Sequence, residues 1–178
     1  MQTQQIERKY LPEFVYGGID GIITTFAVVA GSIGAGLSSA VVLILGFANL
    51  FADGFSMAVS NYLSKKSIKE LYRKNKHISS LKPKSPKKSA IATFFAFVVM
   101  GFIPLISFVL ALSIPLVDNN KFLYSTILTA IAFLFVGGMK GHIVEKPVVK
   151  SALETLLIGG IAAIIAFFVG FLLRGLAG

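Results

Sequence analysis

The sequence lacks cysteine and tryptophan altogether and contains few charged residues, which make up 14% of its 178 positions. Without cysteine there are no disulfides, no thiolate metal sites and no cysteine nucleophiles. A soluble domain carries about 25% charged residues, so the low value argues against a water-soluble globule. Apolar residues take their place, at 55% of the chain with a mean hydropathy of +0.80. The composition therefore predicts an integral membrane protein.

Long uncharged stretches predict five membrane crossings, because a spanning helix needs about 20 residues. Residues 21–52 carry no charge. As one helix they would be about 48 Å long, too long for one crossing, and the small residues 34–39 divide them. Pro104 should kink the third helix, and Pro115 should lie near its end. We predict an all-α membrane protein, a single integral membrane domain over residues 1–178, with helices at about 14–36, 38–63, 89–114, 122–142 and 152–173.

The basic residues predict the orientation of the chain. Residues 65–88 contain ten of the 17 Lys and Arg residues and a single acid, Glu70, and so carry the whole net charge of +9. If the N-terminus is cytoplasmic, every basic residue except Lys121 and Arg174 lies on the inner side. The positive-inside rule then places the C-terminus outside or in a lumen. We expect residues 65–88 to form a basic cytoplasmic loop on anionic membrane lipid, and we expect no nucleic-acid binding, because aromatic residues are not interleaved there.

Two acidic residues lie deep inside the predicted spans, whereas Glu154 falls in the first turn of the last one. A charge at the centre of a membrane helix costs about 2.5–3.5 kcal/mol and therefore usually marks a pathway. Asp20 is predicted to lie roughly 9 Å from the inner end of the first helix, and Asp53 roughly 15 Å from the inner end of the second. Each belongs to a stripe of polar side chains at helical spacing. The stripes consist of Tyr16, Asp20 and Thr24 on the first helix and Asn49, Asp53, Met57 and Asn61 on the second.

The chemistry of these stripes favours a borderline divalent metal. Carboxylate oxygens alone suit Mg²⁺, Ca²⁺ or Mn²⁺, whereas the thioether of Met57 adds a soft ligand. A site of Asp20, Asp53 and Met57 should therefore prefer Fe²⁺, with Mn²⁺ behind it, as a transported substrate rather than a permanently bound cofactor. Protonation of the same carboxylates could couple metal release to proton uptake. We predict a divalent-metal transporter.

Other interpretations of these residues stay open. Both aspartates could hydrogen-bond across helices or pair with Lys140, in a membrane scaffold that transports nothing, and a carrier of another divalent cation is also possible. An enzyme is not expected, because a phosphatidyl transferase of the CDP-alcohol type needs acids four residues apart to hold paired metals. The small residues of the first helix, including Gly17, Gly21 and Gly31, are expected to serve close helix packing.

Two segments resemble the vacuolar iron transporter (VIT) family. One is residues 16–67, with Asp-Gly-x-x-Thr-x-Phe-Ala from Asp20 and Ala-Asp-Gly-x-Ser-Met-Ala from Ala52; the other is the final helix, residues 150–173. The resemblance implies a five-helix protomer, a homodimer with the metal path near its interface, and proton antiport that exports Fe²⁺ and often Mn²⁺ from the cytosol. The translocation residues of the family would fall on Asp20 and Met57.

The chain departs from the VIT pattern at two places. Metal-sensing members insert a Glu-rich cytosolic domain between the second and third helices, where this chain has its short lysine-rich segment. Many relatives also have Gly-Glu-Tyr where this chain has Ser60-Asn61-Tyr62. We therefore expect a short form without cytosolic metal capture. Its small size favours a prokaryotic cell membrane over a vacuolar or other organelle membrane.

Overall fold

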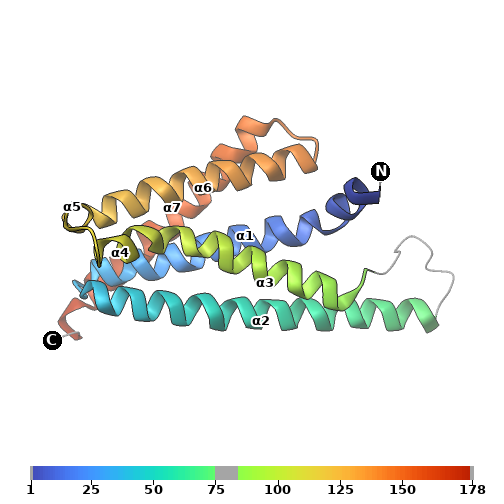
Figure 1. Ribbon diagram of the computed structural model, residues 1–178, viewed down its shortest axis with the longest axis horizontal. Coiled ribbons are helices and arrows are strands. Elements are labelled where there is room, and N and C mark those ends of the chain that lie inside the picture. Colours follow the sequence, from blue (N-terminus) through green and yellow to red (C-terminus); the bar gives the residue numbers. More distant parts are fainter. Residues whose placement is uncertain (1, 75–83, 177–178) are drawn as a thin grey trace.

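The computed structural model describes residues 2–74 and 84–176 as an all-α bundle (Figure 1). Within these residues, five helical stretches are long and apolar enough to cross a membrane. The predicted all-α class with five helices of spanning length is confirmed. The elements are α1 (Gln2–Gly34), α2 (Ser39–Lys74), α3 (Pro86–Phe102), η1 (Ile103–Leu105), α4 (Ile106–Ala111), α5 (Pro115–Asp118), α6 (Lys121–Ile143), α7 (Val148–Leu172) and η2 (Arg174–Leu176).

The helix breaks fall at glycine and proline. Gly36 has a φ of +74°, a left-handed conformation that glycine adopts without strain, and it turns the chain between α1 and α2. Pro104 lies in the 3-10 turn η1, which joins α3 to α4, because proline lacks the N–H that an α-helix needs there. Pro115 begins the short helix α5 just after the third crossing ends.

The predicted basic loop at residues 65–88 is wrong at both of its ends, where the chain is helical. Residues 65–74 continue α2 as helix instead of forming a loop. Lys, Glu, Arg and Leu are good helix formers, and Lys66 lies 4.0 Å from Glu70 one turn away, so this segment extends the helix without needing an apolar core. Residues 75–83 of the predicted loop lie outside the described residues. Pro86 then begins α3, a first-turn position that suits proline.

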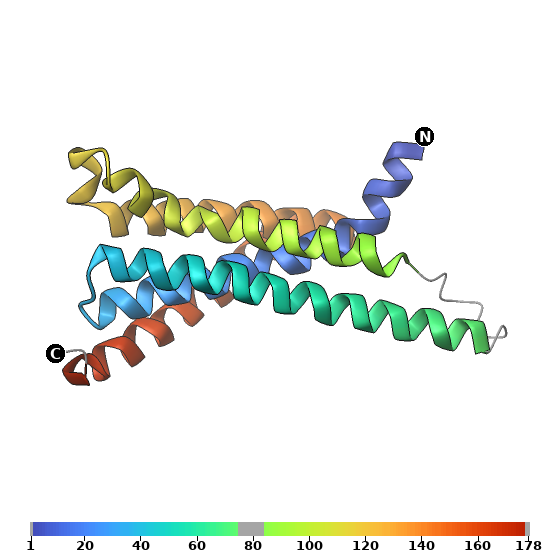
Figure 2. The ribbon, with the colours of Figure 1, turned by 60° about the horizontal axis from the view of Figure 1, so that its bottom comes forward.

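Helix α1 occupies the centre of the bundle. It packs most extensively against α3 and α7 and also against α2 and α6, while α2 pairs with α3 and α6 with α7. Figures 1 and 2 show α2 and α3 side by side, with the last turns of α2 extending past the start of α3, and the red end of the last helix near the turn between α1 and α2. Since α1 touches the other four long helices, it forms the core of the described bundle.

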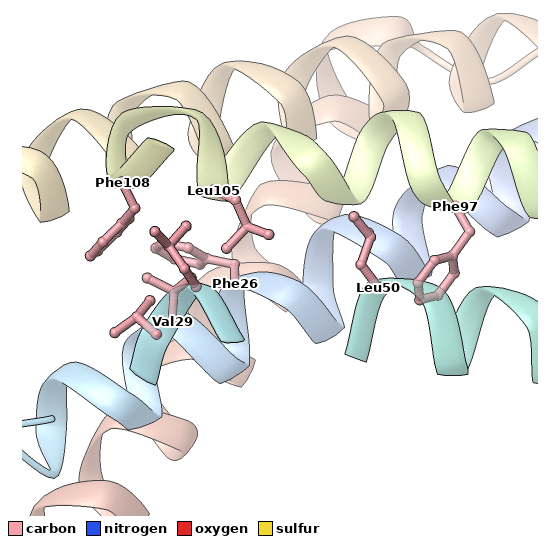
Figure 3. Packing of buried hydrophobic residues seen from close by; sticks show 8 residues of the cluster. Phe26, Val29, Leu50, Phe97, Leu105 and Phe108 are labelled. Carbon is pink, nitrogen blue, oxygen red and sulfur yellow. The ribbon is translucent and has the colours of Figure 1, made fainter. Parts of the chain in front are cut away.

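The bundle is held together by two apolar clusters and by close backbone contacts. One cluster joins α1, α2, α3 and α4, and Figure 3 shows Leu50 and Phe97 in it, with Phe26 further along. Glycines bring α1 against its neighbours: a Cβ on Gly17 would lie 2.7 Å from the carbonyl oxygen of Thr93, and one on Gly21 would overlap the carbonyl of Phe97. Only glycine allows α1 and α3 to approach so closely.

Candidate functional site

The two aspartates inside the spans lie near each other on the neighbouring helices α1 and α2. Asp20 is half-buried and Asp53 is exposed on the surface of the protomer. Asp53 lies close enough to Asp20 to act on its carboxyl group electrostatically. Within residues 10–74 and 84–176, neither carboxylate has a hydrogen-bond or ion-pair partner. Lys140, the predicted alternative partner, lies 3.5 Å from Glu154 instead.

A cavity of about 400 Å³ reaches into the protein between α1 and α2. Three of the predicted pathway residues line it together: Tyr16, Met57 and Asn61. Its remaining lining residues are Pro12, Glu13, Ser60, Ser64, Lys65 and Lys84. Met57 also packs against the main apolar cluster, so it lies between the core and the cavity.

The aspartates lie just beyond the deep end of this cavity rather than in its wall. Asp20 follows the lining residue Tyr16 by four positions on α1, and Asp53 precedes the lining residue Met57 by four positions on α2. One helical turn is about 6 Å, so each aspartate is about that much further from the basic end of the bundle. The cavity and the pair of carboxylates thus follow one another along the contact between α1 and α2.

An ion-pair cluster that the sequence analysis missed lies at the mouth of the cavity. The carboxylate of Glu13 is only 4% exposed, and Lys84 Nζ donates to its two oxygens at 2.9 and 2.8 Å. Lys65 Nζ lies 3.7 Å from the same carboxylate, and the Ser89 hydroxyl donates to it at 3.3 Å. One carboxylate is therefore held by two lysines from different parts of the chain.

The helical spacing of α1 contains the signal for Glu13. This residue lies three positions before Tyr16 and seven before Asp20, on the same face of the helix. The helix predicted from the sequence begins one residue later, at Phe14, and its polar stripe therefore starts only at Tyr16. Lys84 cannot be assigned as the partner from spacing, because 71 residues separate it from Glu13 in the sequence.

The other predicted pathway residues have differing surroundings. Tyr16 is 65% exposed, so its ring stands open beside the cavity. Asn61 donates from its side-chain amide to the Thr93 hydroxyl of α3, and Thr24 donates its hydroxyl to the backbone carbonyl of Asp20 at 2.9 Å. The amide nitrogen of Asn49 is buried without a hydrogen-bond partner in the described part of the chain. Neither Thr24 nor Asn49 lines the cavity.

A single protomer offers few metal ligands. Among the described residues, no group of three or more His, Cys, Asp and Glu side chains is placed to hold a metal ion. Asp20 and Asp53 contribute two carboxylates, and Met57 a thioether, to the same contact between α1 and α2. Gly31, the third predicted packing glycine, lies against α7, where a Cβ added to it would be 3.3 Å from the carbonyl oxygen of Ala166.

Comparison with known proteins gives one consistent family. The sequence matches the VIT family over residues 11–80 and 75–171. It is 27% identical to the vacuolar iron transporter of Toxoplasma gondii over an alignment of 229 positions, which covers 95% of this chain and 76% of that protein. It is 29% identical to vacuolar iron transporter 1 of Eucalyptus grandis, over 87% of this chain and 83% of the relative. The protein is a multi-pass membrane protein and belongs to the VIT family.

Proposed function

We propose that the protein exports a divalent transition metal, Fe²⁺ or Mn²⁺, from the cytosol in exchange for protons. The observation that carries this proposal is the pair of carboxylates of Asp20 and Asp53. They lie near each other inside the spans without a hydrogen-bond or ion-pair partner in the described residues, one turn beyond a cavity that reaches Met57. A scaffold would be expected to use such carboxylates in contacts between helices, since an unsatisfied polar group in hydrocarbon is costly.

The ligand set explains the choice of metal. Carboxylate oxygens bind hard divalent ions, and the thioether of Met57 adds affinity for Fe²⁺ over Mg²⁺ and Ca²⁺. The absence of cysteine from the sequence leaves the site weaker than a storage site. Weak binding suits a carrier, because the ion must leave again. The vacuolar iron transporters among the relatives support iron as the cargo.

We propose that a second copy of the chain completes the pathway. Asp53 is exposed on the protomer surface within a helix that is long and apolar enough to cross the membrane. Left in contact with lipid, this charge would cost about 2.5–3.5 kcal/mol. Contact of α2 with its counterpart in a homodimer would remove Asp53 from lipid. It would also bring four aspartates together, enough to surround one ion.

The route begins at the basic end of the bundle, which the positive-inside rule places in the cytosol. A metal ion approaching Glu13 must displace Lys84 from its carboxylate before passing to Tyr16 and Met57. Beyond these residues the ion meets Asp20 and Asp53. When it leaves, protons neutralise the carboxylates, and the empty carrier crosses between its two states without unpaired charges in the membrane.

The proposal is tested by metal flux into proteoliposomes, followed with a trapped fluorescent metal chelator. Wild type should transport Fe²⁺ and acidify the opposite compartment. Asp20→Asn should abolish flux while leaving the helical content and the dimer unchanged. Asp118→Asn is the matched control, because Asp118 is exposed in the short helix α5 and should leave transport intact.

The same assay separates the competing functions. If wild type moves no metal and Asp20→Asn unfolds the protein, the aspartates serve only to join helices. If Mg²⁺ or Ca²⁺ flux is as fast as Fe²⁺ flux and Met57→Leu has no effect, the cargo is a different divalent cation. We propose that the protein lies in a prokaryotic cell membrane. If labelling of the protein in cells stained an organelle membrane instead, its location would be the one given by the names of the vacuolar relatives.

A further inference from the structure

Helices α2 and α3 form an apolar groove on the outer surface of the bundle. It has a volume of about 340 Å³ and is lined by side chains such as Phe55 and Val59 of α2 and Ala90 and Phe94 of α3. Apart from Tyr62, its lining side chains are all apolar. A groove of this kind within a spanning segment is suited to hydrocarbon.

A basic pocket lies directly beyond one end of the groove. Its volume is about 310 Å³, and Lys66, Lys69 and Arg73 of α2 line it together with Lys87 of α3. Glu70 is the one acid in its wall and lies 4.0 Å from Lys66. The other three basic side chains form no ion pair within the described residues. The pocket therefore carries an excess of positive charge.

The groove and the pocket adjoin each other at one residue. Tyr62 lines both of them, so the apolar walls pass into the basic walls at this residue. Along α2 the lining residues follow one another at spacings of three and four positions, from Phe55 through Tyr62 to Arg73. At about 100° per residue they form one stripe, apolar inside the predicted span and basic at its end. Figures 1 and 2 show α2 and α3 side by side over this stretch.

This stripe lies on the opposite side of α2 from the metal pathway. Phe55 follows Asp53 by two positions, about 200° around the helix. A second copy that covered Asp53 would therefore leave the groove open to the membrane. The occupant must then come from the lipid phase and must carry negative charge at the level of Lys69 and Lys87.

We propose that this composite site binds one anionic phospholipid. An acyl chain lies in the groove, and the phosphate of the headgroup lies in the basic pocket, where lysine and arginine donate to its oxygens. The helix rises about 10 Å from Phe55 to Tyr62, within one leaflet of a hydrocarbon core about 30 Å thick. A soluble phosphate compound would occupy only the pocket. A zwitterionic lipid has no net charge and would leave the positive charge of the pocket uncompensated.

Binding of phosphatidylglycerol to the full chain in detergent micelles, measured by native mass spectrometry and by thermal stabilisation, tests this assignment. Lys69→Gln/Lys87→Gln should weaken binding about thirtyfold, since each basic residue near a lipid surface contributes about a fivefold factor. Lys146→Gln/Lys150→Gln is the matched control, because it removes two exposed lysines, one from the connection between α6 and α7 and one from the first turn of α7. It should leave binding unchanged.

Two comparisons on the wild-type protein test the assignment without variants. Phosphatidylglycerol should bind at least tenfold more tightly than phosphatidylcholine, and water-soluble glycerol 1-phosphate should not compete with it. Equal binding of the two lipids would overturn the role of the basic pocket. Effective competition by glycerol 1-phosphate would show a soluble phosphate site instead. Equal loss of binding in both double variants would show that binding depends only on the overall positive charge of this end of the protein, and would overturn the assignment to the pocket.

Discussion

Removing either partner of the ion pair between Glu13 and Lys84 should destabilise the protein unequally. The Glu13 carboxylate is 4% exposed, whereas the Lys84 side chain is 25% exposed. Lys84→Gln leaves a buried carboxylate without its closest cation, and Lys65, at 3.7 Å, compensates in part. Glu13→Gln leaves an ammonium group that can turn to solvent, and the new amide oxygen still accepts a hydrogen bond from it.

The magnitudes follow from this difference in burial. Breaking a fully buried ion pair costs about 3–5 kcal/mol, and an exposed pair contributes about 0–1 kcal/mol. With one partner buried and the other partly exposed, we expect Lys84→Gln to lower the free energy of unfolding by about 2 kcal/mol. Glu13→Gln should lower the free energy of unfolding by about 1 kcal/mol. The double variant, Glu13→Gln with Lys84→Gln, should lower it only slightly more than Glu13→Gln alone. The resulting coupling energy is about 1.5 kcal/mol.

The assay is unfolding in mixed micelles, titrated with a denaturing detergent and followed by far-ultraviolet circular dichroism. Lys87→Gln is the matched control, because Lys87 is exposed and lies three residues after Lys84. It should change the free energy of unfolding by less than about 0.5 kcal/mol. The reasoning is refuted if Lys84→Gln behaves like Lys87→Gln, or if the effects of Glu13→Gln and Lys84→Gln simply add.

Three further outcomes are expected. Lys84→Gln should lower the metal concentration needed for half-maximal flux, because no tethered cation then competes for Glu13; an unchanged or higher concentration would remove Glu13 from the route. Met57→Leu should reduce the preference for Fe²⁺ over Mg²⁺ in competition flux assays, since leucine keeps the volume without the sulfur, and an unaltered preference would exclude a ligand role. Gly21→Ala should lower the thermal unfolding temperature, because the added Cβ would overlap the Phe97 carbonyl. Gly160→Ala should not lower it, because there is open space around Gly160. Equal effects of the two substitutions would contradict close packing of α1 on α3.

The helical architecture could be predicted from the sequence because hydropathy and helix breakers act locally. The turn at Gly36 and the interruption at Pro104 both fall where expected. The extension of α2 to Lys74 did not follow, because a lysine-rich segment without an apolar stripe gives no periodic signal even when its residues favour helix.

The candidate site could be predicted only in part. Spacing along one helix grouped Tyr16 with Asp20, and the structure brings Tyr16, Met57 and Asn61 to one cavity. Contacts between distant segments gave no such signal. The pairing of Glu13 with Lys84 and the bond from Asn61 to Thr93 depend on how α3 packs against α1 and α2. The exposure of Asp53 likewise depends on the whole bundle.

Anomalous X-ray scattering from crystals soaked in Mn²⁺ or grown anaerobically with Fe²⁺ tests the metal pathway most directly. We expect an anomalous peak between α1 and α2, with carboxylate oxygens of Asp20 and the sulfur of Met57 among its ligands and Asp53 beside it. The peak should be lost in crystals of Asp20→Asn. The crystals should come from a transport-competent preparation. The proposed route would be contradicted if metal bound only elsewhere on the protein and none lay beside Asp20 and Asp53.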